Sequence, residues 1–272
     1  YFNASLYTPF GIAGVETLGY EIAMQCREKY GKDPDVVVCT NAGGGNLTGT
    51  ARGLIKAGAE SQIVAASVNL KGLHMASDEQ FNKKSFTTGH TGFGIPFTTW
   101  PDRSDVPRSA ARPMRYMDRY LTETQGSVFY MTEALASLEG LEKGPAGNTA
   151  LAAAFALAQE MDQDQMILVQ ETEYTGAGKH IQPQLAFAKE NGIEVVFGDP
   201  SDEVPGKNIV LPAHPSMIRV KDSDMAKLRK SLIKNALEMT GKVPTDEDIE
   251  FLAKETKSDV EFVKNAISEL QK

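Results

Sequence analysis

The sequence predicts an α/β fold, with a mostly parallel sheet flanked by helices and a helical appendix at the C-terminal end. Three observations lead to this prediction. Apolar strand patterns alternate with amphipathic helix patterns up to about residue 200. The run Val36-Val37-Val38-Cys39 is apolar throughout, which is typical of a parallel strand covered on both faces. After about Arg219 the chain changes to charged, amphipathic helix patterns.

The individual elements follow this alternation. An amphipathic helix is predicted over residues 14–29, stopped by Gly31 and Pro34, with one stripe formed by Val15, Leu18, Ile22 and Cys26. The sequence then predicts, in order, a strand at 35–40, a helix at 47–57, a strand at 61–69, irregular chain at 71–113, a helix at 112–124, a strand at 126–132 and a helix at 133–141. An Ala-rich helix at 143–161, a strand at 165–173, a helix at 181–192 and a strand at 193–200 complete the α/β part.

Residues 220–272 have a different character. A charged helix at 222–241 ends at Gly241, and two further helices have Thr245 and Ser258 as predicted N-caps. This segment contains no catalytic constellation. We therefore expect two parts, an α/β domain over residues 1–219 and a helical interaction appendix over residues 220–272.

The bulk properties exclude several classes of function. A net charge of −8 and a pI of about 5.2 argue against nucleic acid as a partner, since phosphate neutralisation needs clustered Lys and Arg. Two cysteines form no disulfide framework, so a reducing, cytoplasmic compartment is expected. No apolar run is long enough to span a bilayer, so no membrane is expected. The histidines have no metal-ligand spacing, which predicts no metal.

The most informative stretch is the glycine run that follows the strand at 35–40. Gly43, Gly44 and Gly45 remove every Cβ there, so that several backbone N–H groups can converge on one anion at the start of the next helix. Asn46 and Thr48 add short polar side chains. The run therefore predicts a phosphate-binding loop; the alternative is a glycine-rich turn that only lets the helix and strand pack closely.

The common nucleotide motifs do not fit this loop. A Walker A motif needs a lysine after its last glycine, but Thr50 follows Gly49. The dinucleotide pattern Gly-x-Gly-x-x-Gly fails to register, and the next strand ends in Ser67-Val68-Asn69 without an acidic residue. The remaining common phosphate is that of a compact cofactor such as pyridoxal phosphate.

At this point the chain resembles a known family. "PDVVVCTNAGGGNLTGTARGL" is similar to the phosphate loop of fold-type II pyridoxal-phosphate (PLP) enzymes, the group of tryptophan synthase β, threonine dehydratase and cysteine synthase. Similar segments at 1–22, 138–158 and 166–180 occur in the family's order. The amino-acid sequences of residues 169–200 and 245–267 are most similar to those of members that cleave 2-amino-4-oxopentanoate with coenzyme A in ornithine catabolism.

The resemblance implies specific roles at the phosphate loop. Gly43, Gly44, Gly45 and Asn46 would donate backbone N–H groups to the phosphate of pyridoxal 5'-phosphate, with help from the Asn46 side chain. Leu47 would add only its backbone N–H.

The resemblance also suggests partners for the cofactor ring. A neutral hydroxyl would face the pyridine nitrogen, with Thr172 as first choice, Thr175 as competitor and the Glu173 acid as a further possibility. Glu139 matches a glutamate that lies near the ring, although it also fits an ordinary acid at a helix end. Three loop residues, Arg103, Arg108 and Arg112, would meet a carboxylate or a coenzyme A phosphate, or else be surface arginines.

One feature departs from the family. Its Schiff-base lysine lies well upstream of the phosphate loop, whereas Lys29 and Lys32 here belong to a helix end and a turn. No catalytic residue is therefore expected in this chain. We expect it to be the C-terminal part of such an enzyme, with the lysine supplied by a missing N-terminal segment or a second chain.

The implied activity is thiolytic cleavage of 2-amino-4-oxopentanoate with coenzyme A, which gives acetyl-CoA and alanine. The expected partners are the amino-acid substrate, coenzyme A, an α subunit and further copies of the chain. Two alternatives remain open at this stage. One is a PLP-dependent lyase or synthase of the threonine dehydratase or cysteine synthase type. The other is a non-catalytic, phosphate-binding assembly subunit.

Overall fold

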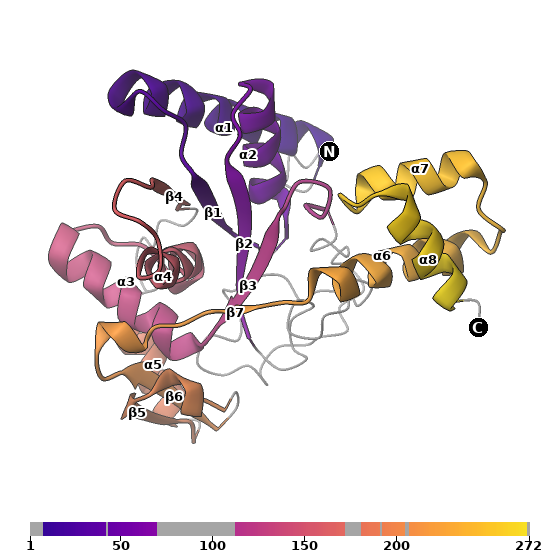
Figure 1. The fold of residues 1–272 in the computed structure, drawn as a ribbon. Coiled ribbons are helices and arrows are strands. Elements are labelled where there is room, and N and C mark those ends of the chain that lie inside the picture. The colour runs from indigo at the N-terminus through magenta and orange to yellow at the C-terminus, as the bar shows by residue number, and fades with distance from the viewer. Residues whose placement is uncertain are drawn as a thin grey trace, which may run out of the picture.

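The main sheet has five strands in the order β4-β1-β2-β3-β7 (Figure 1). The computed structural model describes residues 8–41, 43–69, 112–171, 181–190, 192–204 and 207–270. β1 (Val36–Thr40), β2 (Gln62–Val68), β3 (Arg119–Glu123) and β4 (Ile167–Gln170) are parallel, and β7 (Lys221–Asp222) is antiparallel to β3. The predicted α/β class with a mostly parallel sheet is confirmed.

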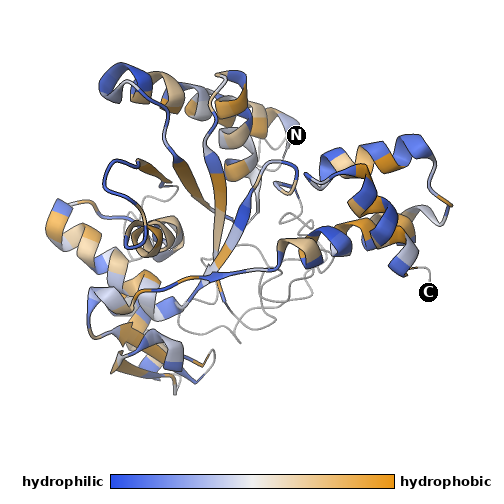
Figure 2. Cartoon of the chain, viewed as in Figure 1, coloured by the Kyte–Doolittle hydropathy of each residue, from blue (hydrophilic) through white to orange (hydrophobic). Residues whose placement is uncertain are grey.

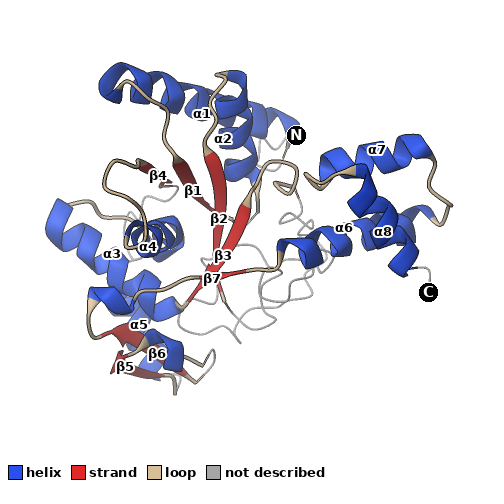
Figure 3. Cartoon of the chain, in the orientation of Figure 1, coloured by secondary structure: helices blue, strands red, loops and turns tan. Residues whose placement is uncertain are grey.

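Helices cover both faces of this sheet (Figures 1 and 3). α1 (Pro9–Tyr30) and α2 (Gly45–Lys56) pack on the face that carries Val37 and Cys39. α4 (Pro145–Ala158) packs on the face that carries Val36 and Val38, and α3 (Gln125–Glu139) lies beside α4. Because both faces are covered, β1 and β4 are hydrophobic over most of their length (Figure 2).

A second, two-stranded sheet lies beside α3 (Figure 1). Its strands β5 (Glu194–Gly198) and β6 (Asn208–Pro212) are parallel and follow α5 (Ile181–Glu190). Two short 3-10 helices, η3 (Pro200–Asp202) and η4 (Pro215–Met217), flank β6 in the chain. The predicted helix at 181–192 and strand at 193–200 are confirmed, whereas β6 and β7 had no counterpart among the predicted elements.

Two of the predicted elements are wrong. The segment predicted as a helix at 112–124 is a turn at 112–116 followed by β3, and the predicted strand at 126–132 is the first half of α3. The physical reason is tertiary. β3 pairs in parallel with the edge of β2, and Thr124 then caps α3 by accepting a hydrogen bond from the Ser127 N–H.

The predicted apolar stripe of α1 is wrong at Leu18, whereas Cys26 is buried, Ile22 packs against the core and Val15 lies at the crossing with α2. The buried residues of α1 are Ile12, Glu16, Gly19, Ala23 and Cys26, whereas Leu18 is 40% exposed. The helix faces α2 through small residues because the two backbones approach closely there. The predicted stop at Gly31 is confirmed, because Gly31 is a left-handed C-cap with φ 72°.

The last three helices are α6 (Met225–Thr240), α7 (Asp246–Glu255) and α8 (Val260–Leu270), which stand beside the main sheet (Figure 1). Thr245 is confirmed as an N-cap and forms a capping box with Asp248. The predicted Ser258 cap is wrong. Asp259 accepts the N–H of Phe262 at 2.6 Å, whereas the Ser258 hydroxyl bonds Thr256.

The beginning of the predicted appendix is integrated with the rest of the chain. β7 pairs with β3, and Leu228 of α6 is fully buried in the same cluster as Tyr120. A second cluster around Ile233, Leu252 and Val263 joins α6 to α7 and α8. In the described residues, no helix is both long and apolar enough to cross a membrane.

Candidate functional site

The carboxyl ends of four parallel strands meet at one edge of the main sheet. Thr40 pairs with Ala66, which pairs with Leu121, and Cys39 pairs with Gln170 on the other side of β1. Parallel sheets bind their ligands beyond this edge. The polar side chains at the ends of these four strands are Thr40, Asn41, Asn69, Glu123, Gln170 and Glu171.

The glycine loop leaves β1 at this edge and opens α2. Gly43, Gly44 and Gly45 are buried, and Gly44 is the N-cap of α2 in the left-handed region, with φ 75°. No side chain caps the first turn of α2, whose amides are those of Gly45, Asn46 and Leu47. The Leu47 side chain lies fully buried in the core, so only its backbone can face a ligand.

Neighbouring elements hold this loop in place. Arg112 donates a hydrogen bond from Nη1 to the Gly43 carbonyl, so one of the arginines expected to meet an anion binds the loop backbone. Thr40 donates to the Gly147 carbonyl at 3.1 Å and accepts the Ala150 N–H at 3.0 Å. The start of α4 is thereby fixed against the end of β1, next to the glycine loop.

Asn41, which directly follows β1, forms a buried pair with Tyr120. Asn41 Nδ2 donates to the Tyr120 hydroxyl at 3.1 Å, while Asn41 Oδ1 has no hydrogen-bond partner within the described ranges. Burial raises the pKa of the Tyr120 phenol well above its ordinary value, although its hydrogen bonds with Asn41 and Ser67 oppose the shift. The phenol is therefore neutral at physiological pH and serves as a fixed hydrogen-bonding group.

Glu123 ends β3 at the same edge. Its side chain is 3% exposed, and neither carboxylate oxygen has a hydrogen-bond partner in the part of the chain that the structure describes. Burial raises the pKa of this carboxyl well above its ordinary value. Sequence reasoning missed Glu123 because it assigned residues 112–124 to a helix; the available signal was the short run Tyr120-Leu121-Thr122, with two residues that favour strands, before a capping threonine.

Glu139 lies at the opposite end of α3 from β3. It is exposed at the C-terminal end of α3, beside the left-handed Gly140, and the helix begins 14 residues earlier at Gln125. At 1.5 Å per residue this puts Glu139 about 21 Å from the start of α3. Its exposure fits an ordinary helix-end acid, and its place near the cofactor ring stays a prediction. Thr172, Glu173 and Thr175 lie outside the described residues.

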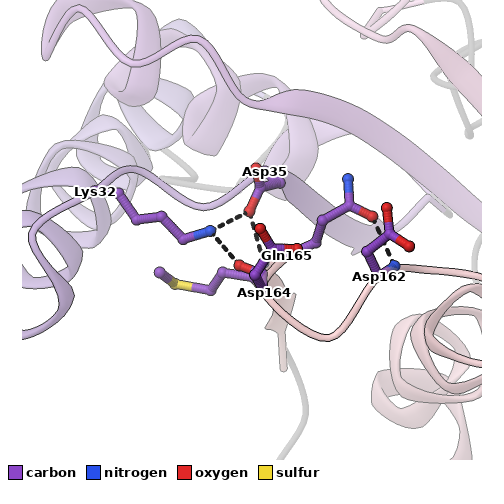
Figure 4. A network of polar contacts seen from close by, with 6 residues as sticks. Lys32, Asp35, Asp162, Asp164 and Gln165 are labelled. Atoms are coloured by element: carbon purple, nitrogen blue, oxygen red, sulfur yellow. Dashed lines mark hydrogen bonds and ion pairs between the residues drawn. The ribbon is translucent and has the colours of Figure 1, made fainter.

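The two early lysines lie at the opposite edge of the sheet. Lys32 donates to Asp35 Oδ2 at 2.9 Å and to the Asp164 carbonyl at 2.5 Å, where the chain enters β1 and β4 (Figure 4). Asp35 also accepts the Met166 N–H, which completes this network. Lys29 lies over the Tyr30 ring at the end of α1. The length of β1, about 16 Å at 3.3 Å per residue, separates Lys32 from the glycine loop.

The edge therefore combines two kinds of binding group. The glycine loop offers backbone donors and the positive end of α2, which suits an anion such as a phosphate. Asn41 and Glu123 offer buried oxygens without partners among the described residues, which suits a ligand that donates hydrogen bonds. No group of three or more His, Cys, Asp or Glu side chains that could hold a metal ion occurs in the described ranges.

One protein family and two curated proteins match most or all of this chain. The family described as "Pyridoxal-phosphate dependent enzyme" matches residues 1–172. A protein of Acetoanaerobium sticklandii named 2-amino-4-ketopentanoate thiolase beta subunit is 77% identical over 272 residues, all of this chain and 58% of that protein. A second protein of that name, from an unknown prokaryotic organism, is 63% identical over 99% of this chain and 58% of its own length.

More distant matches share less of the chain. Cystathionine beta-synthase of Oryctolagus cuniculus is 29% identical over 58% of this chain and 26% of its own length. The structure of threonine deaminase isoform 2 from Solanum lycopersicum is 16% identical, with a TM-score of 0.48 over 67% of this chain and 50% of that one. The chain spans 58% of the length of each of the two thiolase-named relatives.

Proposed function

The chain belongs to the family of pyridoxal-phosphate dependent enzymes, and on that premise we propose that its glycine loop binds the phosphate of pyridoxal 5'-phosphate. The buried loop at the end of β1, without a side-chain cap on α2, is the observation that carries the proposal. The amides of Gly43, Gly44, Gly45, Asn46 and Leu47 are the donors. The half-buried Asn46 side chain assists at the rim.

The proposed reaction is thiolytic cleavage of 2-amino-4-oxopentanoate by coenzyme A, which yields acetyl-CoA and alanine. The two relatives at 77% and 63% identity, both named for a thiolase acting on this compound, support it over a lyase or synthase activity. Cystathionine beta-synthase, the relative that would favour the latter, is only 29% identical. Because both thiolase relatives are named beta subunits, we include an α subunit among the partners, as well as further copies of this chain.

Each part of the edge has a role in this proposal. The bound cofactor withdraws electrons from the substrate carbon that carries the amino group. The glycine loop would bind its phosphate through backbone N–H groups. Arg112 holds the loop through the Gly43 carbonyl, and Tyr120 fixes Asn41, which follows β1 shortly before the loop. Thr172 is proposed to face the pyridine nitrogen, with Thr175 as the competitor.

Replacing Gly44 by alanine tests the loop, with Gly31→Ala as a matched control. Both glycines are helix caps in the left-handed region, with φ 75° and 72°, so both substitutions impose a similar backbone cost of about 1 kcal/mol. Only Gly44→Ala disturbs the loop. We expect at least a tenfold weaker affinity for pyridoxal 5'-phosphate in Gly44→Ala, measured by spectroscopic titration, and unchanged affinity in Gly31→Ala.

Equal affinities in the two variants would remove the phosphate from this loop. The reaction is tested separately, by following acetyl-CoA formation from 2-amino-4-oxopentanoate and coenzyme A with the companion subunit present. Serine and threonine serve as comparison substrates. Turnover of these, with no acetyl-CoA formed from the proposed substrate, would support the lyase alternative instead.

A further inference from the structure

Three glutamates are buried among the described residues, and they differ in what they bind. Glu16 forms ion pairs with Arg52, at 2.6 Å, and with Lys56. Glu203 accepts backbone N–H groups from Gln125, Gly126 and Val210. Glu123 is the most deeply buried of the three, yet neither of its oxygens has a hydrogen-bond partner in the described part of the chain. The buried Glu123 carboxyl therefore lowers the free energy of unfolding.

A structural role as a helix cap is not open to Glu123. The residue lies two positions before α3, where an acid commonly binds the first amides of the helix. Those amides are already bound. Glu203 accepts the N–H groups of Gln125 and Gly126 at 2.7 and 2.8 Å, and Thr124 accepts that of Ser127. An unpaired buried carboxyl that does not serve the fold points to a ligand.

The sheet register places Glu123 level with the glycine loop. Glu123 pairs with Val68, two residues beyond the row formed by Thr40, Ala66 and Leu121. Its Cα is therefore level with the start of the loop that follows Thr40. β1 and β3 are separated by β2, so two strand spacings, about 10 Å, lie between them. That distance suits the two ends of one small molecule.

Glu123 lies on the face of the sheet that α4 covers. Side chains alternate along a strand, so Glu123 lies on the same face as Leu121, which packs with Ala150 and Ala153 of α4. Thr40 bonds the start of α4 on this face as well. Glu123 is thus on the side of the sheet where the first turn of α4 meets the end of β1.

We propose that Glu123 is a ligand-binding residue of this edge, and that it binds a positively charged nitrogen, the ammonium group of the amino-acid ligand as it enters the site and before that nitrogen reacts. The identity of this ligand rests on the proposed function; the unpaired state of the carboxyl does not. A cation turns the isolated carboxyl into a hydrogen-bonded ion pair, whereas an anion would repel it and an apolar group would leave it unsatisfied. The glycine loop, by contrast, offers backbone N–H groups that bind an anion.

The first test compares stability, with Glu203 as the matched buried glutamate. Without any ligand, Glu123→Leu is expected to raise the Tm by about 2–4 °C, because it removes an unsatisfied carboxyl from the interior. Glu203→Leu is expected to lower the Tm, because it leaves three backbone N–H groups without their acceptor. A fall in Tm for Glu123→Leu similar to that for Glu203→Leu would show a structural role and overturn the proposal.

The second test measures binding of 2-amino-4-oxopentanoate to the protein by calorimetry, with and without pyridoxal 5'-phosphate. Glu123→Gln retains the shape but not the charge, and Glu123→Leu removes both. In the titration without cofactor we expect at least tenfold weaker binding in Glu123→Gln and a greater loss in Glu123→Leu, with unchanged binding of pyridoxal 5'-phosphate itself. Unchanged amino-acid binding in both variants would overturn the proposal.

The two proposals fail in different ways. Failure of the unsubstituted protein to bind pyridoxal 5'-phosphate would contradict the proposed function. In that case the titration without cofactor and the stability comparison still decide the role of Glu123. Normal cofactor binding, combined with equal amino-acid binding in all variants, would contradict only the role of Glu123.

Discussion

At the scale of single residues, Glu203 shows how a distant side chain completes a helix. Its carboxylate lies 78 residues beyond Gln125 in the chain and accepts the first amides of α3. The side chain is 8% exposed. Burial raises the pKa of this carboxyl from its ordinary 4.5 to about 7, against the opposing effect of its backbone hydrogen bonds. The folded protein therefore holds the Glu203 proton more tightly than the unfolded chain does.

This difference predicts a pH-dependent stability. The contribution of Glu203 to the free energy of unfolding is fully present below pH 4.5 and is lost as the pH rises through about 7. Over that window the loss amounts to about 3 kcal/mol. Glu203→Gln cannot titrate, so the stability of the original protein relative to this variant should decrease between pH 5 and pH 8. Urea denaturation at several pH values measures both.

Two outcomes would contradict this prediction. A difference between the two proteins that stays constant from pH 5 to pH 8 would show that the Glu203 pKa is the same in the folded and unfolded states. A difference that grows with pH would mean that the backbone hydrogen bonds outweigh burial and lower the pKa.

At the scale of elements, the crossing of α1 and α2 depends on glycines. A Cβ on Gly19 would lie 2.0 Å from the Thr50 carbonyl oxygen, and one on Gly53 would lie 2.0 Å from the Glu16 carbonyl oxygen. A Cβ on Gly49 would lie 2.5 Å from that of Val15. The two backbones can be this close only without these side chains. Since α2 begins at the glycine loop, the crossing also sets where that loop lies.

Two glycines of the same helix provide a matched test. Gly14→Ala places its methyl group in open space, and is expected to stabilise the protein by up to about 1 kcal/mol through helix propensity. Gly19→Ala must push α2 away, and is expected to cost about 1–3 kcal/mol despite the same gain in propensity. Thermal or urea unfolding measures both changes. Equal effects of the two substitutions would mean that the close crossing is not maintained in solution.

At the scale of the whole molecule, α6 connects two hydrophobic clusters. Leu228 lies with Tyr120 in the main core, whereas Ile233 packs with Leu252 and Val263 of the last two helices. The ion pairs Arg115–Glu255 and Lys257–Asp118 link those helices to the turn before β3. Such exposed pairs contribute little energy. We therefore propose that α7 and α8, within the appendix of residues 220–272, can unfold without disrupting the cofactor site.

Placing a charge in the second cluster tests this independence. Val263 is fully buried, so Val263→Asp is expected to unfold α7 and α8 by burying an unpaired carboxylate. Amide hydrogen exchange should increase in residues 246–270 but not in β1 to β3, and affinity for pyridoxal 5'-phosphate should be retained. Val243→Asp, at a residue 83% exposed, is the control and should change neither measurement. Loss of cofactor binding in Val263→Asp would show that the two clusters form one cooperative unit.

The sequence alone determined the elements whose residue pattern lies within one short stretch of the chain. The buried strand β1, the glycine loop and the start of α2 were all predicted, because an apolar run and three consecutive glycines specify a strand and a tight turn without help from the rest of the chain. The helix stop at Gly31 and the cap at Thr245 were correct for the same reason. These features also led to the correct family.

Tertiary structure decided the features whose partners are distant in the chain. β3 forms because the edge of β2 is available to pair with it, and α3 then starts against Glu203 from a later loop. α1 buries Gly19 rather than Leu18 because the glycines of α2 allow the two helices to approach closely. It buries Glu16 because Arg52 and Lys56 of α2 form ion pairs with that carboxylate. Glu123 lies level with the glycine loop only through the register of three strands. Local periodicity can specify a helix or a strand, but strand pairing, helix contacts and the environment of a buried charge depend on residues brought together by the fold.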